Sequence, residues 1–248
     1  MSRSKGRYVG VQLNGWRCQS SNSTNSHLYK KSLRASKTPH VKLELLPINE
    51  LLVHEEVESY RLKRILADIA LHRLIFKPII VESKKFIVID GHHRLAALKS
   101  LGAKYIPAYV ADYHRDISMI SGWMLVSKRV TGFSKALRAI EEVESLCKRG
   151  PDELLVKIAN DVLRIRVDRI DVYLAMKHIN ITSTLCLLKM PYNKSVCLSS
   201  DLCILPPLLR PMDIYKVVER GLKLPARTTL HITDLKALPK TSSIKALY

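Results

Sequence analysis

Long apolar runs are absent from this sequence, although 47% of its 248 residues are hydrophobic. A membrane-spanning helix needs about 20 consecutive apolar residues, so the composition predicts a packed core and no membrane span. The five cysteines form no CxxC motif and no zinc-finger spacing with histidine. We therefore expect buried or free thiols, in a reducing cytoplasm, at Cys18, Cys147, Cys186, Cys197 and Cys203.

Two common phosphate-binding motifs are missing as well. The sequence has neither the GxxxxGKS/T loop of Walker-type proteins nor the glycine-rich loop of protein kinases. A secretory signal is not predicted, because the first residues lack an apolar segment. Any nucleotide must therefore be held by a different structure.

Acidic residues are absent from residues 1–40, which carry eight Lys and Arg. The formal net charge is +19, and the rest of the chain keeps +11 of it. Such a charge suits nucleic acid, a membrane surface or a small anionic substrate, and does not choose between them. We expect residues 1–40, rich in Ser, Asn, Lys and Arg, to form a disordered tail. An organelle transit peptide and a wrongly assigned start codon are the alternatives.

Regular patterns begin at residue 41 and alternate between strands and helices. In the first part we expect strands at 41–48, 78–81, 86–89 and 106–110, and helices at 55–74 and 92–101. Further on we expect helices at 134–148, 167–179 and 211–221 and strands at 155–158, 162–165, 184–189 and 202–205. Residues 222–232 read as a loop with a strand-like end. This mixture predicts an α/β or α+β fold.

The turn Asp90-Gly91-His92-His93-Arg94 joins an apolar strand to a helix. A helix N-terminus with a glycine, two histidines and an arginine is suited to binding an anion, most often phosphate. Asp90 could equally cap the helix, Gly91 could simply permit a tight turn, and Arg94 could form a surface ion pair. Adjacent histidines lie about 100° apart on a helix, so one could touch a ligand while the other supports it.

Residues 90–103, DGHHRLAALKSLGA, resemble the signature of the ParB/sulfiredoxin-like fold, in which this turn binds nucleotide phosphates. Sulfiredoxins have a cysteine in the turn, and ParB proteins have Gly-Glu-Arg-Arg followed by a helix-turn-helix. The sequence is more similar to the free L-serine kinases. Four segments carry that similarity, in the family's order: Val53–Glu56, Phe76-Lys77-Pro78, Asp90–Arg94 and Pro225–His231.

This resemblance implies an enzyme that transfers phosphate from ATP or ADP, with Mg²⁺, to the hydroxyl of free L-serine. The product, O-phosphoserine, would feed cysteine or related amino-acid biosynthesis in the cytoplasm. It also implies a ParB/sulfiredoxin-like N-terminal domain at 41–115 and a smaller α/β C-terminal domain at 116–248, with the site between them. The partners would be serine and nucleotide, without a membrane.

The resemblance also implies a role for each site residue. Glu55 would be the catalytic base, with Glu56 the neighbour most easily confused with it; a first-turn acid that favours the helix dipole is the alternative. Asp90 would be catalytic and hold Mg²⁺. The implied phosphate ligands are Lys77, Gly91, His92, His93 and Arg94, and the implied substrate ligands are Trp123, Arg227, Thr228, Thr229 and His231. Without the family, Lys77 reads as a solvated lysine and Trp123 as a partly buried aromatic.

One position departs from the family pattern. The arginine that the family has between the threonines and the histidine is Leu230 here, and Arg227 could replace part of its charge. A changed substrate or decayed catalysis is therefore an alternative. A ParB-like DNA-binding or nucleotide-switch protein is the other alternative, favoured by the net charge and disfavoured by the Thr-Thr-Leu-His segment.

Overall fold

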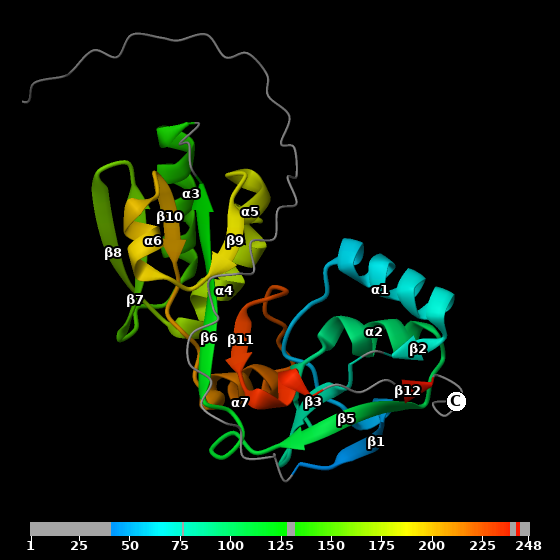
Figure 1. Cartoon of the computed structure of the whole chain (residues 1–248). Coiled ribbons are helices and arrows are strands. Elements are labelled where there is room, and N and C mark those ends of the chain that lie inside the picture. The colour runs from blue at the N-terminus through cyan, green and yellow to red at the C-terminus, as the bar shows by residue number, and fades with distance from the viewer. Residues whose placement is uncertain (1–40, 76, 128–131, 239–241, 244–248) are drawn as a thin grey trace, which may run out of the picture. The chain divides into compact units, whose positions relative to one another are not determined.

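The structure, a computed structural model, describes residues 41–75, 77–127, 132–238 and 242–243 (Figure 1). Helices and strands alternate along these residues, which confirms the predicted mixed class. The predicted tail at 1–40 and Phe76 lie outside the described residues. None of the described helices is long and apolar enough to cross a membrane.

The first sheet has four strands in the order β1-β5-β3-β4. Its strands are β1 (Leu43–Pro47), β3 (Ile79–Glu82), β4 (Val88–Asp90) and β5 (Tyr105–Ala111). The helices α1 (Ser59–His72) and α2 (His92–Ser100) cover one face (Figure 1). Ile69 and Leu98 of these helices pack there against Ile79, while Ile80 on the other face packs against Ile214 of α7 (Pro211–Glu219).

The second sheet has six strands: five lie in the order β11-β6-β10-β7-β8, and β9 pairs with β6 off this path. Its strands are β6 (Met119–Ser127), β7 (Asp152–Ile158), β8 (Asp161–Val167), β9 (Leu188–Pro191), β10 (Leu202–Leu205) and β11 (Thr229–Ile232). The core beside it contains α3 (Phe133–Leu146) and α4 (Arg169–His178). The remaining elements are short: η2 (Ile48–Glu50), β2 (Leu74–Ile75), α5 (Ile181–Thr184), α6 (Lys194–Ser199), η3 (Asp234–Ala237) and β12 (Ser242–Ser243).

Local sequence signals placed several elements correctly. Pro211 begins α7, and Gly221 follows its end with φ +64°. The hairpin predicted around Asn160-Asp161 joins β7 to β8 in antiparallel register. The predicted helix at 92–101 is α2, and Gly102 follows it with φ +76°.

Other expectations were wrong. The first helix begins at Ser59 rather than at residue 55, because Glu55 forms a parallel bridge with Leu224 instead of a helical turn. The strand expected at 184–189 begins later: Thr184 is the last residue of α5, and β9 runs from Leu188 to Pro191. Strand β6 was missed, since its run MISGWMLVS shows no clean alternation. Helix α6 was missed too.

The cysteines also differ from expectation. Cys197 of α6 and Cys203 of β10 form a disulfide across six positions of sequence, with Cα atoms 5.3 Å apart. Both are fully buried against Met124 and Leu205. Helix α6 folds back onto β10, and no spacing rule in the sequence indicates this. Because these two cysteines are paired, free thiols no longer argue that the chain lies in a reducing compartment. Cys147 is a free thiol.

Reduction of the Cys197–Cys203 disulfide should lower the melting temperature. A cross-link that closes a loop this short stabilises by about 2 kcal/mol in the chain-entropy model. For a chain of this size that corresponds to a shift of about 4–8 °C on adding a phosphine reductant, measured by calorimetry. The double variant C197A/C203A should melt at the same temperature with and without reductant. An equal shift in both proteins would show that the reductant acts elsewhere.

Candidate active site

Glu55 is held by the backbone of residues 227–229. Its Oε1 accepts hydrogen bonds from the N–H of Thr228 at 3.1 Å and of Thr229 at 2.7 Å, and from the Thr229 hydroxyl at 2.7 Å. Its Oε2 accepts one hydrogen bond among the described residues, from the N–H of Arg227 at 3.0 Å. A carboxylate offers about four acceptor positions, so the open position belongs to Oε2. Arg227 has φ +59°, which turns successive N–H groups toward one anion.

His54, next to Glu55 in sequence, contacts the Thr229 hydroxyl that donates to Glu55. Its Nε2 lies 3.2 Å from the Thr229 hydroxyl oxygen. Because that hydroxyl donates its hydrogen to Glu55, it must accept from His54, which therefore carries its proton on Nε2. The His92 ring packs edge-on against His54 at 4.6 Å between centroids. Burial, followed by the charge of His92, lowers the pKa of His54 to about 3, so the ring is neutral.

Three buried histidines should make stability depend on pH. Burial lowers the pKa of His92 to about 4, and that of His231 well below its ordinary 6.5. Below pH 6.5 the unfolded chain binds protons that folded His54, His92 and His231 do not. The free energy of unfolding should therefore fall as the pH drops from about 6.5 toward 4, with a slope of up to about 1.4 kcal/mol per pH unit for each histidine.

Thermal unfolding between pH 7 and pH 4.5 measures this slope. The variant H92Q should flatten it, whereas H114Q, at an exposed position, should leave it unchanged. Equal slopes in wild type and H92Q would contradict the assignment of a buried neutral imidazole to His92.

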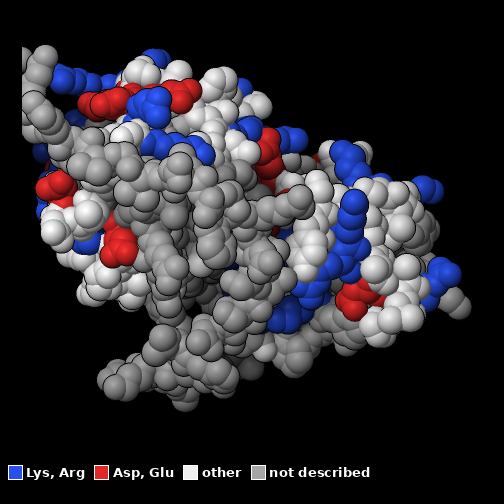
Figure 2. All heavy atoms as spheres, turned by 90° about the horizontal axis from the view of Figure 1, so that it is seen from above, with Lys and Arg blue, Asp and Glu red and all other residues white. Residues whose placement is uncertain are grey.

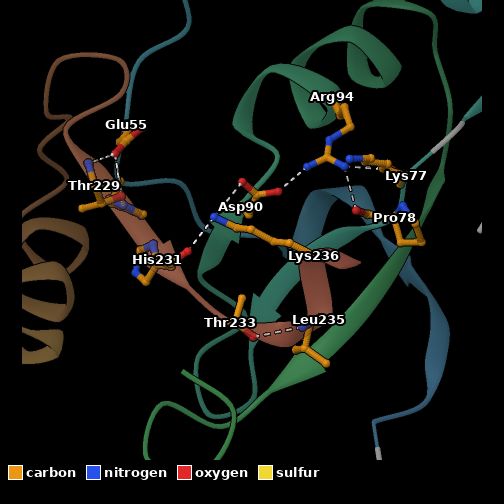
Figure 3. Close-up of polar contacts among 11 residues, drawn as sticks. Glu55, Lys77, Pro78, Asp90, Arg94, Thr229, His231, Thr233, Leu235 and Lys236 are labelled. Carbon is orange, nitrogen blue, oxygen red and sulfur yellow. Dashed lines mark hydrogen bonds and ion pairs between the residues drawn. The ribbon is translucent and has the colours of Figure 1, made fainter. Parts of the chain in front are cut away.

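The turn at 90–94 joins β4 to α2, as the sequence predicts. Gly91 has φ +109° and lies so close to Ile79 that a Cβ atom would stand 2.5 Å from Ile79 Cγ2. Arg94 donates to Asp90 Oδ2 at 2.5 Å and to the carbonyls of Lys77 and Pro78 at 3.0 and 2.8 Å (Figure 3). Burial raises the pKa of Asp90, but the charges of Arg94 and Lys236 outweigh it and lower the pKa overall. Asp90 is therefore a carboxylate.

Glu55 and the turn at residues 90–94 line one cavity of about 810 Å³. Glu55, Asp90, Gly91, His93 and Arg94 line it together with Trp123, Arg227 and Thr229. The guanidinium of Arg227 lies 3.9 Å above the Trp123 ring, a cation–π contact. His93 accepts the N–H of Glu58 on its Nε2 at 2.9 Å, so its Nδ1 carries the proton. Residues more than 170 positions apart in sequence thus form one site.

Three of the predicted residues are placed differently from the rest. Lys77 lines a neighbouring cavity of about 290 Å³ beyond Arg94. Thr228 is buried, and its hydroxyl donates to the Pro225 carbonyl at 2.7 Å. His231 lines the large cavity, but its ring is 1% exposed and its Nε2 lies 3.1 Å from the Tyr113 hydroxyl. Thr228 and His231 therefore shape the loop rather than present a side chain to a ligand.

Sequence reasoning missed three cations that line the large cavity: Arg61, Arg64 and Lys236. Arg61 and Arg64 lie three positions apart on α1, and Figure 2 shows a band of basic side chains on the side where this helix lies. Their spacing on one helix face was a usable signal. Lys236 donates to the His231 carbonyl at 2.6 Å and lies 3.7 Å from Asp90 (Figure 3). Nothing near it in the sequence marks this role.

Asp90 is the carboxylate of the turn that could contribute to a Mg²⁺ site. Within the described ranges, no group of three or more His, Cys, Asp and Glu side chains could hold a metal ion. Mg²⁺ in phosphoryl-transfer sites is often bound by one or two carboxylates together with substrate phosphates. These residues therefore fit a metal that arrives with the nucleotide and do not fit a resident metal held by protein alone.

Comparisons with known proteins identify sequences and structures similar to this chain. Residues 29–122 match the ParB N-terminal domain model. The chain is 35% identical over 125 residues to the ATP-dependent L-serine kinase of Staphylothermus marinus, covering 47% of this chain and 48% of that protein. It is 26% identical over 98 residues to the ADP-dependent L-serine kinase of Thermococcus kodakarensis, covering 38% and 39%. The matches thus span less than half the length of these relatives.

A solved structure extends the similarity beyond those segments. The free serine kinase in complex with AMP superposes with a TM-score of 0.67 at 17% identity, and covers 84% of this chain and 94% of its own. The match therefore extends well beyond the residues that match the ParB N-terminal domain model. The chain accordingly has the fold of the free serine kinase, and its residues 29–122 are similar to the ParB N-terminal domain.

Proposed function

We propose that this protein is a kinase that phosphorylates free L-serine to O-phosphoserine, with ATP or ADP as the donor. One observation carries the proposal: the carboxylate of Glu55 and the Asp90–Arg94 turn face the same cavity. A base and a phosphate-binding turn within one cavity are what transfer to a hydroxyl requires. The named serine kinases among its relatives support the substrate.

Glu55 would act through Oε2. The serine hydroxyl would donate its hydrogen to the open position there, while the remaining acceptor positions stay filled by residues 227–229. As the serine oxygen attacks, its bond to the terminal phosphorus forms and the bond from that phosphorus to the bridging oxygen breaks. The proton passes to Glu55, and the shortened nucleotide leaves.

The donor phosphates would lie against the first turn of α2 and the cations around it. Helix N-termini present N–H groups without intrahelical partners, and Arg61, Arg64 and Lys236 add positive charge in the same cavity. Asp90 would hold Mg²⁺ together with the phosphate oxygens, and the metal would supply neutralisation of phosphate charge. Phosphoryl transfer depends mainly on such positioning and charge.

The amino acid would lie between Glu55 and the Trp123–Arg227 pair. Arg227 supplies a guanidinium for the serine carboxylate, which fits the expectation that it compensates for the family's missing arginine. Leu230 lines the cavity without adding charge. We propose that the product feeds cysteine or related amino-acid biosynthesis, and that the enzyme acts in the cytoplasm.

An assay for O-phosphoserine tests the proposal. The full chain is incubated with L-serine, Mg²⁺ and either ATP or ADP, and the product is detected by mass spectrometry. We expect product with one nucleotide, and none when serine is omitted. Absence of product with both nucleotides would overturn the kinase assignment. DNA binding whose affinity falls steeply with the logarithm of salt concentration would then support the ParB-like alternative.

A further inference from the structure

A second cavity, of about 410 Å³, lies behind the loop that holds Glu55. Pro225 to Thr228 form its wall on that side, and the carboxylate of Glu55 faces the other cavity. Glu55 is not among the residues that line the second cavity, so a hydroxyl bound there does not face the proposed base. Its occupant is therefore not the serine that reacts.

The floor of the second cavity is apolar. It is formed by Leu125 of β6, by Tyr173 and Met176 of α4 and by Ile181 of α5. These four side chains are between 1% and 7% exposed and belong to the main core beside the second sheet. The Tyr173 hydroxyl donates to the Pro207 carbonyl at 2.9 Å, so the floor offers little to a polar ligand.

Charges of both signs lie at the edge of that floor. Lys189, opposite Leu125 in the β6–β9 ladder, donates from Nζ to the Ala226 carbonyl at 2.5 Å. An ammonium has three donors, so two remain for a ligand. Glu58 also lines the cavity; its Oε2 pairs with Arg61 Nε at 2.7 Å, which leaves Oε1 for a ligand. Burial is the largest effect on Lys189 and lowers its pKa. The charge of Glu58 raises the pKa of Lys189, and the charge of Arg227 lowers it.

One class of small molecule has a group for each part of this cavity: the basic side chains, the carboxylate of Glu58 and the apolar floor. A free α-amino acid carries a carboxylate for Lys189 and Arg227 and an ammonium for Glu58. Its side chain must then be apolar to cover Met176 and Ile181. We propose that the second cavity binds a free α-amino acid with an apolar side chain, distinct from the serine that is phosphorylated. The distinction from serine rests on the proposed function, whereas the site itself does not.

This site is coupled to Glu55 through a single loop. Arg227 and Trp123 line both cavities, and the guanidinium lies on the indole ring. The backbone N–H groups of Arg227 and Thr228 donate to the two oxygens of Glu55. A ligand that binds the Arg227 guanidinium in the second cavity therefore changes its contact with the Trp123 ring. It also changes the backbone hydrogen bonds to the Glu55 carboxylate.

Fluorescence of Trp123 provides a test that needs no turnover. The chain has two tryptophans, so W16F leaves Trp123 as the sole emitter. We expect saturable changes in emission with L-leucine or L-methionine, and at least tenfold weaker binding of 4-methylpentanoate and isopentylamine, which each lack one charge. L-serine, without an apolar side chain, should bind at least tenfold more weakly than L-leucine in the absence of nucleotide.

Two variants locate the binding. K189M and E58Q in the W16F background should each weaken leucine binding at least tenfold, while K216M, exposed on α7 and outside both cavities, should not. Melting curves establish whether each variant is folded. If K189M does not fold, the binding measured with E58Q decides the result. Leucine binding that is absent, or that is unchanged in the folded variants, overturns the site. Because nucleotide is not used, a failed kinase assay leaves this result intact.

Discussion

Replacing Glu55 by glutamine should lower the rate of serine phosphorylation by about 10²–10⁴-fold, the usual contribution of a positioned base. The amide has nearly the same shape as the carboxylate but cannot take the proton from the serine hydroxyl. It also puts an NH₂ group against N–H donors of residues 227–229, which leaves at least one of them without an acceptor. That loss should cost about 1–3 kcal/mol of stability.

Glu56→Gln is the matched control for E55Q. Glu56 is the next residue, yet its carboxylate forms an ion pair with Lys177 at 2.7 Å and does not line the large cavity. We expect E56Q to keep its rate within about twofold, because an exposed pair contributes less than about 1 kcal/mol. Steady-state rates are measured with saturating nucleotide, and nucleotide affinity is measured separately. A variant that still binds nucleotide is folded, so a lower rate then reports a loss of catalysis. A full rate in E55Q, or an equal loss in E56Q, would show that Glu55 is not the base.

Gly91→Ala should destabilise the fold by about 2–5 kcal/mol, the sum of a left-handed backbone and an overpacked contact. The added Cβ would stand 2.5 Å from Ile79 Cγ2, and Ile79 is fully buried and cannot move aside. It would also stand 3.0 Å from Arg94 Nη2, so the Arg94–Asp90 pair must shift. Nucleotide binding should weaken along with stability.

Gly102→Ala separates the two causes. Gly102 also has positive φ, +76°, but a Cβ there would meet no atom within 4 Å. G102A should therefore lose only about 1–2 kcal/mol and keep nucleotide affinity. Denaturant unfolding and nucleotide titration measure both quantities. Equal losses in the two variants would mean that the contact with Ile79 contributes nothing.

The sequence was most informative where function depends on local order. A strand, a glycine and a helix in succession predict the turn at residues 90–94 without tertiary knowledge, and the structure has this turn between β4 and α2. Prolines, glycines and the Asn-Asp turn likewise predict α7 and the β7–β8 hairpin, because each acts through its own backbone.

Contacts between residues far apart in the sequence limited what could be predicted from it. Glu55 is predicted as the base only by the family resemblance. Its four hydrogen bonds come from residues 227–229, and no periodicity in the sequence reveals contacts over that distance. The contact of Lys236 with Asp90 was missed for the same reason. The Cys197–Cys203 pair is local, and it was missed because no spacing rule indicates that α6 folds back onto β10. Strand β6 gave no alternation because both of its faces are covered; Met124 and Leu125, on opposite faces, are both buried.

The hydrogen bonds between Glu55 and residues 227–229 also determine when Glu55 can be oriented during protein synthesis. The bonded residues are 172 to 174 positions apart. At typical elongation rates Glu55 leaves the ribosome's catalytic centre roughly 9–34 s before the residues that orient it are made. The strands of the first sheet and the turn at residues 90–94 are all made before that interval ends. A nascent chain thus has the proposed phosphate site complete in sequence well before the carboxylate of Glu55 can be aligned, so on the proposed function binding precedes reaction.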